Sequence, residues 1–270
     1  MNMPTDTESQ SRLRITHIGG PTALIEIGPY RIVTDPTFEP AGYRYNAGGQ
    51  EIRKTADPAI SAVALGAVDI VLLSHDQHGD NLDPAGKAFL AQSRETLTTP
   101  EGAQRLGGNA RGVAVGETVS LTGASGLVVR ITATPARHGP EQVAPALAGH
   151  VTGWLLEWEG QRNGALYISG DTVLFPGIEE VARRKRIGIA LLNCGAARAE
   201  RFGPYDITFT GAEAAQAARL LGDATIIPLH YEGWSHLSEG RAEIAQAFAA
   251  TGLSQRLRFL PLGEAVTLDA

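Results

Sequence analysis

The chain has 270 residues, of which 43% are hydrophobic and 19% are charged, and its formal net charge is −6. This composition is typical of a soluble globular protein. The negative charge argues against a nucleic-acid backbone as the main partner, because phosphate binding favours a basic surface. The single cysteine, Cys194, excludes an intramolecular disulfide and a cysteine-rich zinc site.

The N-terminal segment is polar, and we expect residues 1–11 to form a disordered tail. This segment lacks the apolar core of a signal peptide. No apolar run in the sequence is long enough to span a bilayer. We therefore expect a cytoplasmic protein without stable membrane association.

The first half of the chain opens with short apolar segments at 13–18, 23–27 and 31–34, separated by glycine and proline. This pattern predicts an antiparallel β-meander. Residues 37–56 are rich in aromatic residues and glycine and predict a long loop, a kind of segment that is often functional. A short helix from residue 57 and a buried strand over 69–74 follow.

The second half alternates between predicted strands and helices. After a small helix near 101–106 and a strand over 128–134, we expect a flexible stretch that ends at His150. The remaining predicted elements are strands at 152–158 and 165–169, a helix over 177–185, a strand over 187–192, a helix over 211–221, a strand over 224–229, a helix over 239–251 and a last β pair. Without a linker or a repeat, residues 12–270 are predicted to form a single domain.

Ligand-type side chains are concentrated in the segment Ser74–Asp83, directly after the buried strand. The segment reads Ser-His-Asp-Gln-His-Gly-Asp-Asn-Leu-Asp, and its Asp83 is suited to cap a helix that begins at Pro84. Imidazole and carboxylate ligands together favour zinc, with manganese or iron as alternatives. The segment therefore predicts a metal site.

The same pattern, an apolar strand followed by a metal-type ligand, recurs along the chain. A lone histidine after a strand is more often a turn or core residue, but a repeated pattern favours one shared site. Strand ends in one sheet lie along one edge, where such residues converge. The residues in this pattern are Asp35, His75, His78, Asp80, His138, Asp171 and His230.

These motifs resemble the metallo-β-lactamase superfamily, and within it the ascorbate-phosphate-lactonase-like and N-acyl-phosphatidylethanolamine-phospholipase-like hydrolases. The resemblance extends from residue 13 to about residue 268 and implies an α+β fold, a four-layer αββα sandwich with the active site along one edge. The motifs that carry it are Ile18–Ile27, Thr34–Pro36, Leu73–Asp83, Thr134–His138, Ser169–Thr172 and Ile227–His230.

The sequence departs from the family in the central loop, which usually reads His-x-His-x-Asp-His. One alignment treats Gln77 as an inserted residue, so that His75 and His78 form the histidine pair, Asp80 is the aspartate and Asn81 replaces the third histidine. The alternative alignment has no insertion and leaves almost no site. The ending Asp-Asn-Leu-Asp, which matches the family's Asp-His-Leu-Asp, favours the first alignment.

The resemblance then implies two metal positions. The first is held by His75, His78 and His138, and Asp171 bridges to the second, which has Asp80, His230 and Asn81 as ligands. Because an amide is a poorer ligand than imidazole, we expect the second position to be weaker or empty. The expected cofactor is therefore zinc, as one or two ions.

The implied activity is hydrolysis of a small ester, lactone or phosphodiester by a metal-activated water. Asp80 would orient the nucleophile or relay its proton, and His236 would act as an acid or support the site. Arg137 and Tyr231 are predicted to contact a small-molecule substrate. His17 and Asp35 are expected to support the site.

Two alternatives remain at this stage. One is a nuclease or phosphodiesterase that acts on nucleic acid, although no nucleic-acid partner is expected from the charge. The other is a non-catalytic metal-binding or regulatory protein with a degraded second metal site. The sequence leaves open whether the chain forms a homo-oligomer.

Overall fold

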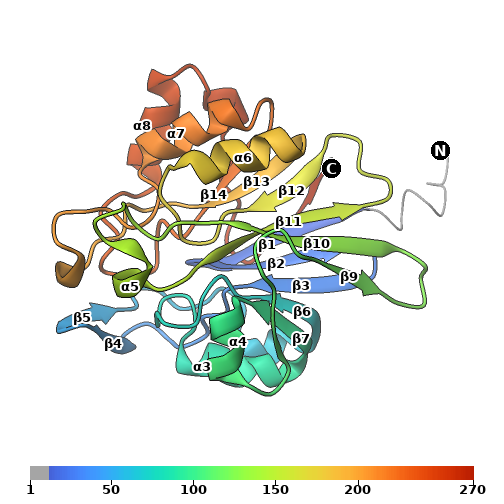
Figure 1. Cartoon of the computed structure of the whole chain (residues 1–270), viewed down its shortest axis with the longest axis horizontal. Helices are drawn as coiled ribbons and strands as arrows, with labels where there is room; N and C mark the ends of the chain where they lie inside the picture. The colour runs from blue at the N-terminus through green and yellow to red at the C-terminus, as the bar shows by residue number, and fades with distance from the viewer. Residues whose placement is uncertain (1–11) are drawn as a thin grey trace.

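The computed structural model describes residues 12–270, except the side chains of Ala144 and Ala146, and the predicted disordered tail lies outside this range. Two β-sheets face each other in the described part of the chain (Figure 1). The first sheet has the strand order β15-β1-β2-β3-β6-β7-β8, and the second has the order β14-β13-β12-β11-β10-β9.

The strands have the following bounds. The first sheet contains β1 (Leu13–Gly19), β2 (Thr22–Ile27), β3 (Tyr30–Thr34), β6 (Val68–Leu72), β7 (Ser93–Thr98), β8 (Ala110–Gly112) and β15 (Ala265–Leu268). The second sheet contains β9 (Thr118–Thr122), β10 (Val128–Pro135), β11 (Thr152–Trp158), β12 (Ala165–Ile168), β13 (Ile187–Asn193) and β14 (Thr225–Leu229).

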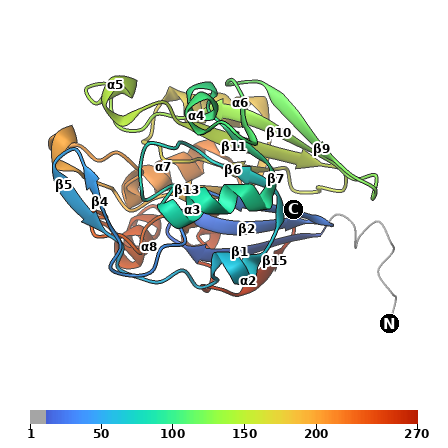
Figure 2. The same cartoon turned by 90° about the horizontal axis from the view of Figure 1, so that it is seen from below.

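Helices cover the outer face of each sheet, as Figures 1 and 2 show. The second sheet is covered by α6 (Pro176–Arg184), α7 (Gly211–Leu220) and α8 (Arg241–Ala250). The first sheet is covered by α2 (Ala62–Leu65), α3 (Pro84–Phe89) and α4 (Pro100–Leu106). Three single turns of 3₁₀ helix occur at η1 (Leu90–Gln92), η2 (Glu200–Phe202) and η3 (Ser254–Arg256). Within residues 12–270, no helix has the length and apolar character needed to cross a membrane.

Three apolar clusters lie between the resulting four layers. Ile25 and Ile131 belong to the cluster between the two sheets. Tyr167 packs with Phe248 between the second sheet and its helices, and the equivalent cluster below the first sheet includes Val71. The predicted four-layer αββα sandwich is therefore confirmed.

The burial of each strand follows from its place in these layers. Along β10, the apolar side chains of Val129, Ile131 and Ala133 are buried, and they alternate with more exposed residues. Such alternation is typical of a strand with one covered face. In contrast, β13 is buried along nearly its whole length, because it lies between two parallel neighbours and both of its faces are covered.

The predicted meander of three antiparallel strands is confirmed by β1, β2 and β3. The prediction of an unstructured loop over residues 37–56 is wrong, since this segment contains a hairpin of β4 (Arg44–Ala47) and β5 (Gln50–Arg53). Tyr45 and Ile52 alternate with polar residues, and Gly48–Gly49 supplies the two-residue turn that antiparallel hairpins favour.

Three other expectations need correction. The first short helix begins at Ala62 rather than near residue 57, because Ser61 provides the side-chain cap. The stretch before His150 contains a helical turn, α5 (Ala144–Ala148). Instead of a final β pair, one last strand is present, and it pairs with β1 from the other end of the chain.

Candidate metal centre

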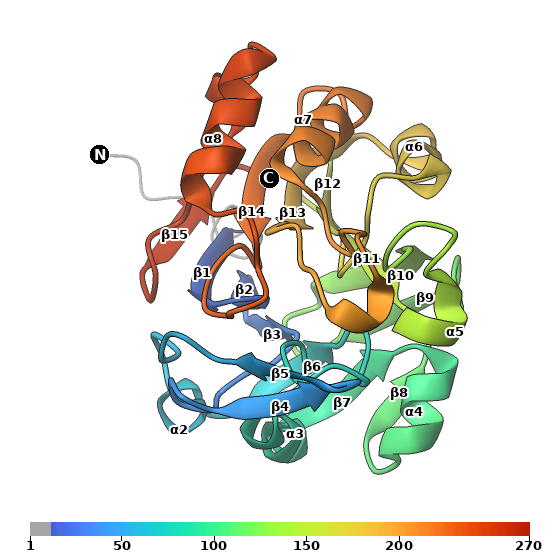
Figure 3. The same ribbon diagram turned by 90° about the vertical axis from the view of Figure 1, so that its left-hand side faces the viewer.

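The strand ends that precede the metal-type residues lie at one end of the sandwich, the end that faces the viewer in Figure 3. His75 follows β6 of the first sheet, whereas His138, Asp171 and His230 follow β10, β12 and β14 of the second. The expectation that a single sheet edge brings them together is therefore too narrow. The site forms where strand ends of two facing sheets meet.

Ser74 connects the two sheets at this point. Its backbone N–H donates a hydrogen bond to Asp35 Oδ1 (2.6 Å), and its carbonyl accepts one from the Thr152 N–H (3.1 Å). Gly170 lies against both residues with a φ of 59°, and a Cβ atom there would come within 2.8 Å of Ser74 Cβ. A glycine at this position is needed for the close approach of the two sheets.

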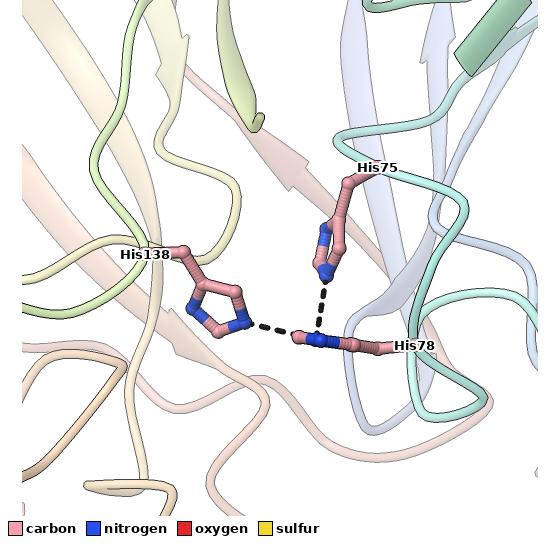
Figure 4. A group of neighbouring side chains, drawn as sticks. All are labelled: His75, His78 and His138. Carbon is pink, nitrogen blue, oxygen red and sulfur yellow. Dashed lines mark hydrogen bonds between the residues drawn. The ribbon is translucent and has the colours of Figure 1, made fainter. Parts of the chain in front are cut away.

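The first group consists of His75, His78 and His138, whose nearest ring nitrogens all lie within 4.8 Å of one another (Figure 4). His78 Nδ1 lies 3.1 Å from His75 Nε2 and 3.0 Å from His138 Nε2. The N–H at His138 Nδ1 donates to the Ile207 carbonyl at 2.7 Å, so the lone pair of its Nε2 faces the group. Gln77 is exposed, which agrees with the alignment that treats it as inserted.

The second group consists of Asp80, His230 and His236. Asp80 Oδ2 lies 3.1 Å from His230 Nε2 and 3.0 Å from His236 Nε2. Asp80 Oδ1 accepts a hydrogen bond of 2.6 Å from the Tyr45 hydroxyl, which the β4–β5 hairpin brings to the site. All three members of the group are buried.

Asp171 lies between the two groups. Its Oδ2 atom is 3.8 Å from His138 Nε2 and 3.7 Å from His230 Nε2, distances too long for hydrogen bonds. Asn193 Nδ2 donates to the other oxygen, Oδ1, at 2.8 Å and thereby fixes the carboxylate. Asp171 Oδ2 thus faces both groups without a hydrogen-bond partner among the described residues.

Asn81 is fully buried close to the first group, and its backbone N–H donates to the His78 carbonyl at 3.2 Å. Its side-chain amide interacts with the carboxyl of Asp35 and acts to lower the pKa of that group. His236, rather than Asn81, completes the second group of histidines and carboxylates. A ligand role for Asn81 stays a prediction.

Burial and mutual charge set the protonation of these groups. Burial lowers the pKa of His75 to about 4 and, together with the neighbouring histidines, holds the pKa of His78 well below its ordinary value. Burial alone would raise the pKa of Asp80, but His236 and His230 hold it well below its ordinary value. The group of three histidines therefore offers neutral imidazoles, and Asp80 offers an ionised carboxylate, which are the forms that bind metal ions. Burial lowers the pKa of His230, but the neighbouring carboxylates outweigh this effect and raise it.

Two non-glycine residues at the site have left-handed backbone conformations. The φ angle is 53° at His230 and 29° at Asp35. The His230 N–H donates to the Gly20 carbonyl (2.8 Å), and the Asp35 N–H donates to the Leu72 carbonyl (3.1 Å). Such conformations cost free energy and cluster at functional sites. Here they turn two strand ends toward the interior of the site.

The structure places both predicted substrate contacts away from these groups. Arg137 lies in a separate surface cavity, where its guanidinium stacks on the Phe175 ring and lies 3.7 Å from Glu141. The Tyr231 side chain packs in the core between the second sheet and its helices, against Phe259. Neither side chain lines the cavity at the site. A position next to a ligand in the sequence does not determine the direction in which a side chain points.

Two further contacts with the site were missed at the level of sequence. Tyr45 reaches Asp80 from the hairpin, and Arg201 Nη2 donates to His78 Nε2 at 2.6 Å from η2. The aromatic composition of residues 37–56 was a signal for Tyr45. No pattern of strand ends marks Arg201.

His17 lies in β1 beneath the site and gives a prediction for the stability of the metal-free protein. Burial lowers its pKa from 6.5 to about 4, so the folded state keeps this ring neutral. Above pH 6.5 the ring is neutral in both states, and its contribution to stability is complete. Below that pH the unfolded chain binds a proton that the folded chain cannot, and stability is lost.

We expect His17→Asn to reduce the acid sensitivity of the metal-free protein. Acidification from pH 7 to pH 5 should lower the free energy of unfolding by about 2 kcal/mol less in the variant than in the wild type. Urea denaturation at the two pH values measures this difference, and comparing each protein with itself removes the effect of the substitution on packing. Equal losses of free energy of unfolding in both proteins would contradict the assignment of a lowered pKa to His17.

The fold and the two groups of ligand-type side chains define a class of protein, the metallo-β-lactamase-like proteins with a candidate binuclear centre. Over residues 30–231 the chain matches the family described as the beta-lactamase superfamily domain, and it belongs to this family. The predicted superfamily is therefore confirmed. The narrower branch proposed from the sequence stays a prediction.

Relatives cover nearly the whole chain. A protein of Pelotomaculum thermopropionicum named "UPF0173 metal-dependent hydrolase" is 29% identical over 95% of this chain and 100% of its own length. A protein of Methanoculleus marisnigri with the same name is 30% identical over 78% of this chain and 87% of its own length. The solved isothiocyanate hydrolase from Delia radicum gut bacteria has a TM-score of 0.78 at 23% identity, covering 95% of this chain and all of that one.

Proposed function

We propose that this protein is a metal-dependent hydrolase with two divalent ions, zinc first among them, bound side by side. The observation that carries the proposal is the convergence of two buried groups of ligand atoms, each within 4.8 Å, on either side of the carboxylate of Asp171. The metal-dependent hydrolases among its relatives support the same activity.

The residues of this chain fit such a pair of ions. His75, His78 and His138 would hold the first ion, a set of three imidazoles that suits zinc and leaves a position open. The second ion would be held by Asp80, His230 and His236. Asp171 would bridge the two through Oδ2, the oxygen that has no hydrogen-bond partner among the described residues.

His236 changes the expectation for the second position. The sequence predicts a weak second position because Asn81 replaces a histidine. In the structure two imidazoles and a carboxylate meet there without the amide, since His236 lies in the loop that follows His230 and reaches Asp80. We therefore propose a second position with a full set of ligands, with manganese and iron as the alternatives to zinc.

Bound ions lower the pKa of water toward neutrality and polarise the scissile carbonyl or phosphoryl oxygen. The protein keeps its ligands in place for this chemistry. The Ile207 carbonyl holds the tautomer of His138, Asn193 holds Asp171, and the Tyr45 hydroxyl holds Asp80. Asp80, between the two imidazoles of its group, is the group that would receive or relay the proton of the nucleophile.

We propose a small ester, lactone or phosphodiester as the substrate. The inner cavity beside Asp80 and His236 has a volume of about 10 Å³, enough for about one water molecule, which is the size of the nucleophile. The net charge of −6 argues against a nuclease. The complete second group of ligand-type residues argues against the degraded metal site on which the non-catalytic alternative rests.

Metal analysis of the purified protein tests this proposal. We expect about two equivalents of metal per chain, and hydrolysis of at least one chromogenic acetate, lactone or phosphodiester that stops with a chelator and returns with zinc or manganese. Protein that stays folded but takes up neither zinc, manganese nor iron would refute the proposal. Full metal content without turnover of any of these substrates would favour the non-catalytic alternative.

A further inference from the structure

Arg201 has an unusual partner for an arginine. Arg198, in the same segment, is paired with the carboxylate of Asp206. Arg201 instead donates from Nη2 to His78 Nε2 at 2.6 Å, so that its permanent charge faces a neutral ring. Within residues 12–270, the charge is therefore held at the metal centre without direct contact with a carboxylate.

The contact between Arg201 and His78 fixes the tautomer of the ring. Because a guanidinium only donates, Nε2 of His78 accepts, and the hydrogen of the neutral ring is on Nδ1. This hydrogen faces the Nε2 atoms of His75 and His138, at 3.1 Å and 3.0 Å. The contacts of the metal-free group are thus consistent with one another.

Metal binding through Nδ1 cannot keep this arrangement. A neutral His78 that binds an ion at Nδ1 carries its hydrogen on Nε2, and Nε2–H then faces the N–H of Arg201. Two donors face each other, and neither has an acceptor. The contact between Arg201 and His78 and the metal-bound state of His78 therefore exclude each other, and the guanidinium must find a new acceptor.

An acceptor can reach Arg201 from an outer cavity of about 310 Å³, a size that fits a small ligand. Arg201 and His78 line this cavity together with Arg105 and His150. Asp76 neutralises Arg105 through two hydrogen bonds. Arg201 also lines the inner cavity beside Asp80, so it lies at the boundary between the two cavities.

Contacts with the hairpin and with η2 hold the stem of Arg201 in place. Its Cδ atom packs against Gly48 in the hairpin turn, where a Cβ atom would come within 2.6 Å, and its guanidinium lies 4.3 Å from the centre of the Phe202 ring. The neighbouring Glu200 N–H donates to Gln50 Oε1 at 2.7 Å. The hairpin and η2 therefore hold the residue in place at the entrance.

We propose that Arg201 binds an anionic group of the substrate, a carboxylate or a phosphate, and that metal binding by His78 releases the guanidinium for this contact. This inference rests on the proposed metal-dependent hydrolase. The substrate would then be a phosphodiester, or a small ester or lactone that also carries a negatively charged group. This charged group would lie on the side of the outer cavity.

The test uses the zinc-loaded full chain as wild type, Arg201→Gln and Arg198→Gln, the last as a matched arginine from the same segment. Each protein is titrated in a calorimeter with inorganic phosphate and with succinate, and its zinc content is measured on the same sample. We expect Arg201→Gln to keep its zinc and to bind one of the anions at least tenfold more weakly, since a charge-assisted hydrogen bond is lost. Arg198→Gln should match the wild type.

The anion whose affinity falls identifies the group, phosphate for a phosphate ester and succinate for a carboxylate. Undiminished binding of both anions by zinc-loaded Arg201→Gln overturns this inference and leaves the hydrolase proposal intact. Loss of zinc from Arg201→Gln also overturns it, because the arginine would then serve the metal ligands. A wild type that takes up no zinc refutes the hydrolase proposal, and this inference with it.

Discussion

Replacing His138 with alanine is expected to abolish metal binding at the three-histidine position and, with it, hydrolysis. The ring supplies one of three ligands, and the Ile207 carbonyl orients it by accepting a hydrogen bond from its Nδ1–H, so alanine leaves two imidazoles at this position. Loss of a partner that only orients a ligand typically costs 10–100-fold, and loss of the ligand itself should reduce kcat/KM by at least about 100-fold. Elemental analysis and a chromogenic assay measure the two effects.

His150→Ala is the matched control for metal content, because His150 is the exposed histidine outside both groups. It should keep the same number of equivalents as the wild type. Unchanged metal content in His138→Ala would show that the ligands are assigned wrongly. Reduced activity with full metal content would instead make His138 a residue that acts on the substrate.

The largest loss of stability is expected from Asp83→Ala. The buried carboxylate accepts the backbone N–H groups of Phe38, Glu39 and Gly86 at 3.0, 2.7 and 2.7 Å, and it lies 3.3 Å from Lys54 Nζ. Its removal leaves a buried cation without its counter-charge and also removes the cap of α3. We expect the free energy of unfolding to fall by about 3–5 kcal/mol in urea denaturation of the metal-free protein.

Lys54→Met provides the comparison, because it removes the cation and leaves Asp83 with its three backbone donors. This variant should lose less stability than Asp83→Ala. The carboxylate is therefore the more important partner of the pair: it joins the loop after β3, the start of α3 and, through Lys54, the hairpin. Equal losses in the two variants would contradict this account.

The strands and most of the site residues could be predicted because their signals are local. An apolar strand followed by histidine or aspartate marks His75, His138, Asp171 and His230. The topology of the two facing sheets brings the ends of these strands together. The layers follow from burial: strands with one covered face alternate, and β13 does not. Each of these patterns can be recognised from residues that are close together in the sequence.

The remaining parts of the site depend on contacts distant in sequence. Tyr45 reaches Asp80 only because the hairpin folds over the site, and Arg201 meets His78 across 123 positions of the chain. The sequence indicates a role for His236 because it closely follows His230, but its position beside Asp80 is seen only in three dimensions. Arg137 and Tyr231 lie next to predicted ligands in the sequence, and their role as substrate contacts stays a prediction.

The pairing of β15 with β1 has a consequence for the synthesis of this protein. Because β1 lies inside the first sheet, that sheet reaches its full width only after residue 268 has been made. The ligand-type residues extend from His75 to His236, so a growing chain on the ribosome holds an incomplete centre until His236 has been made. Long-range pairing of this kind folds slowly and leaves strand edges exposed meanwhile. A nascent chain can therefore complete both metal positions only after every strand of the second sheet has been made.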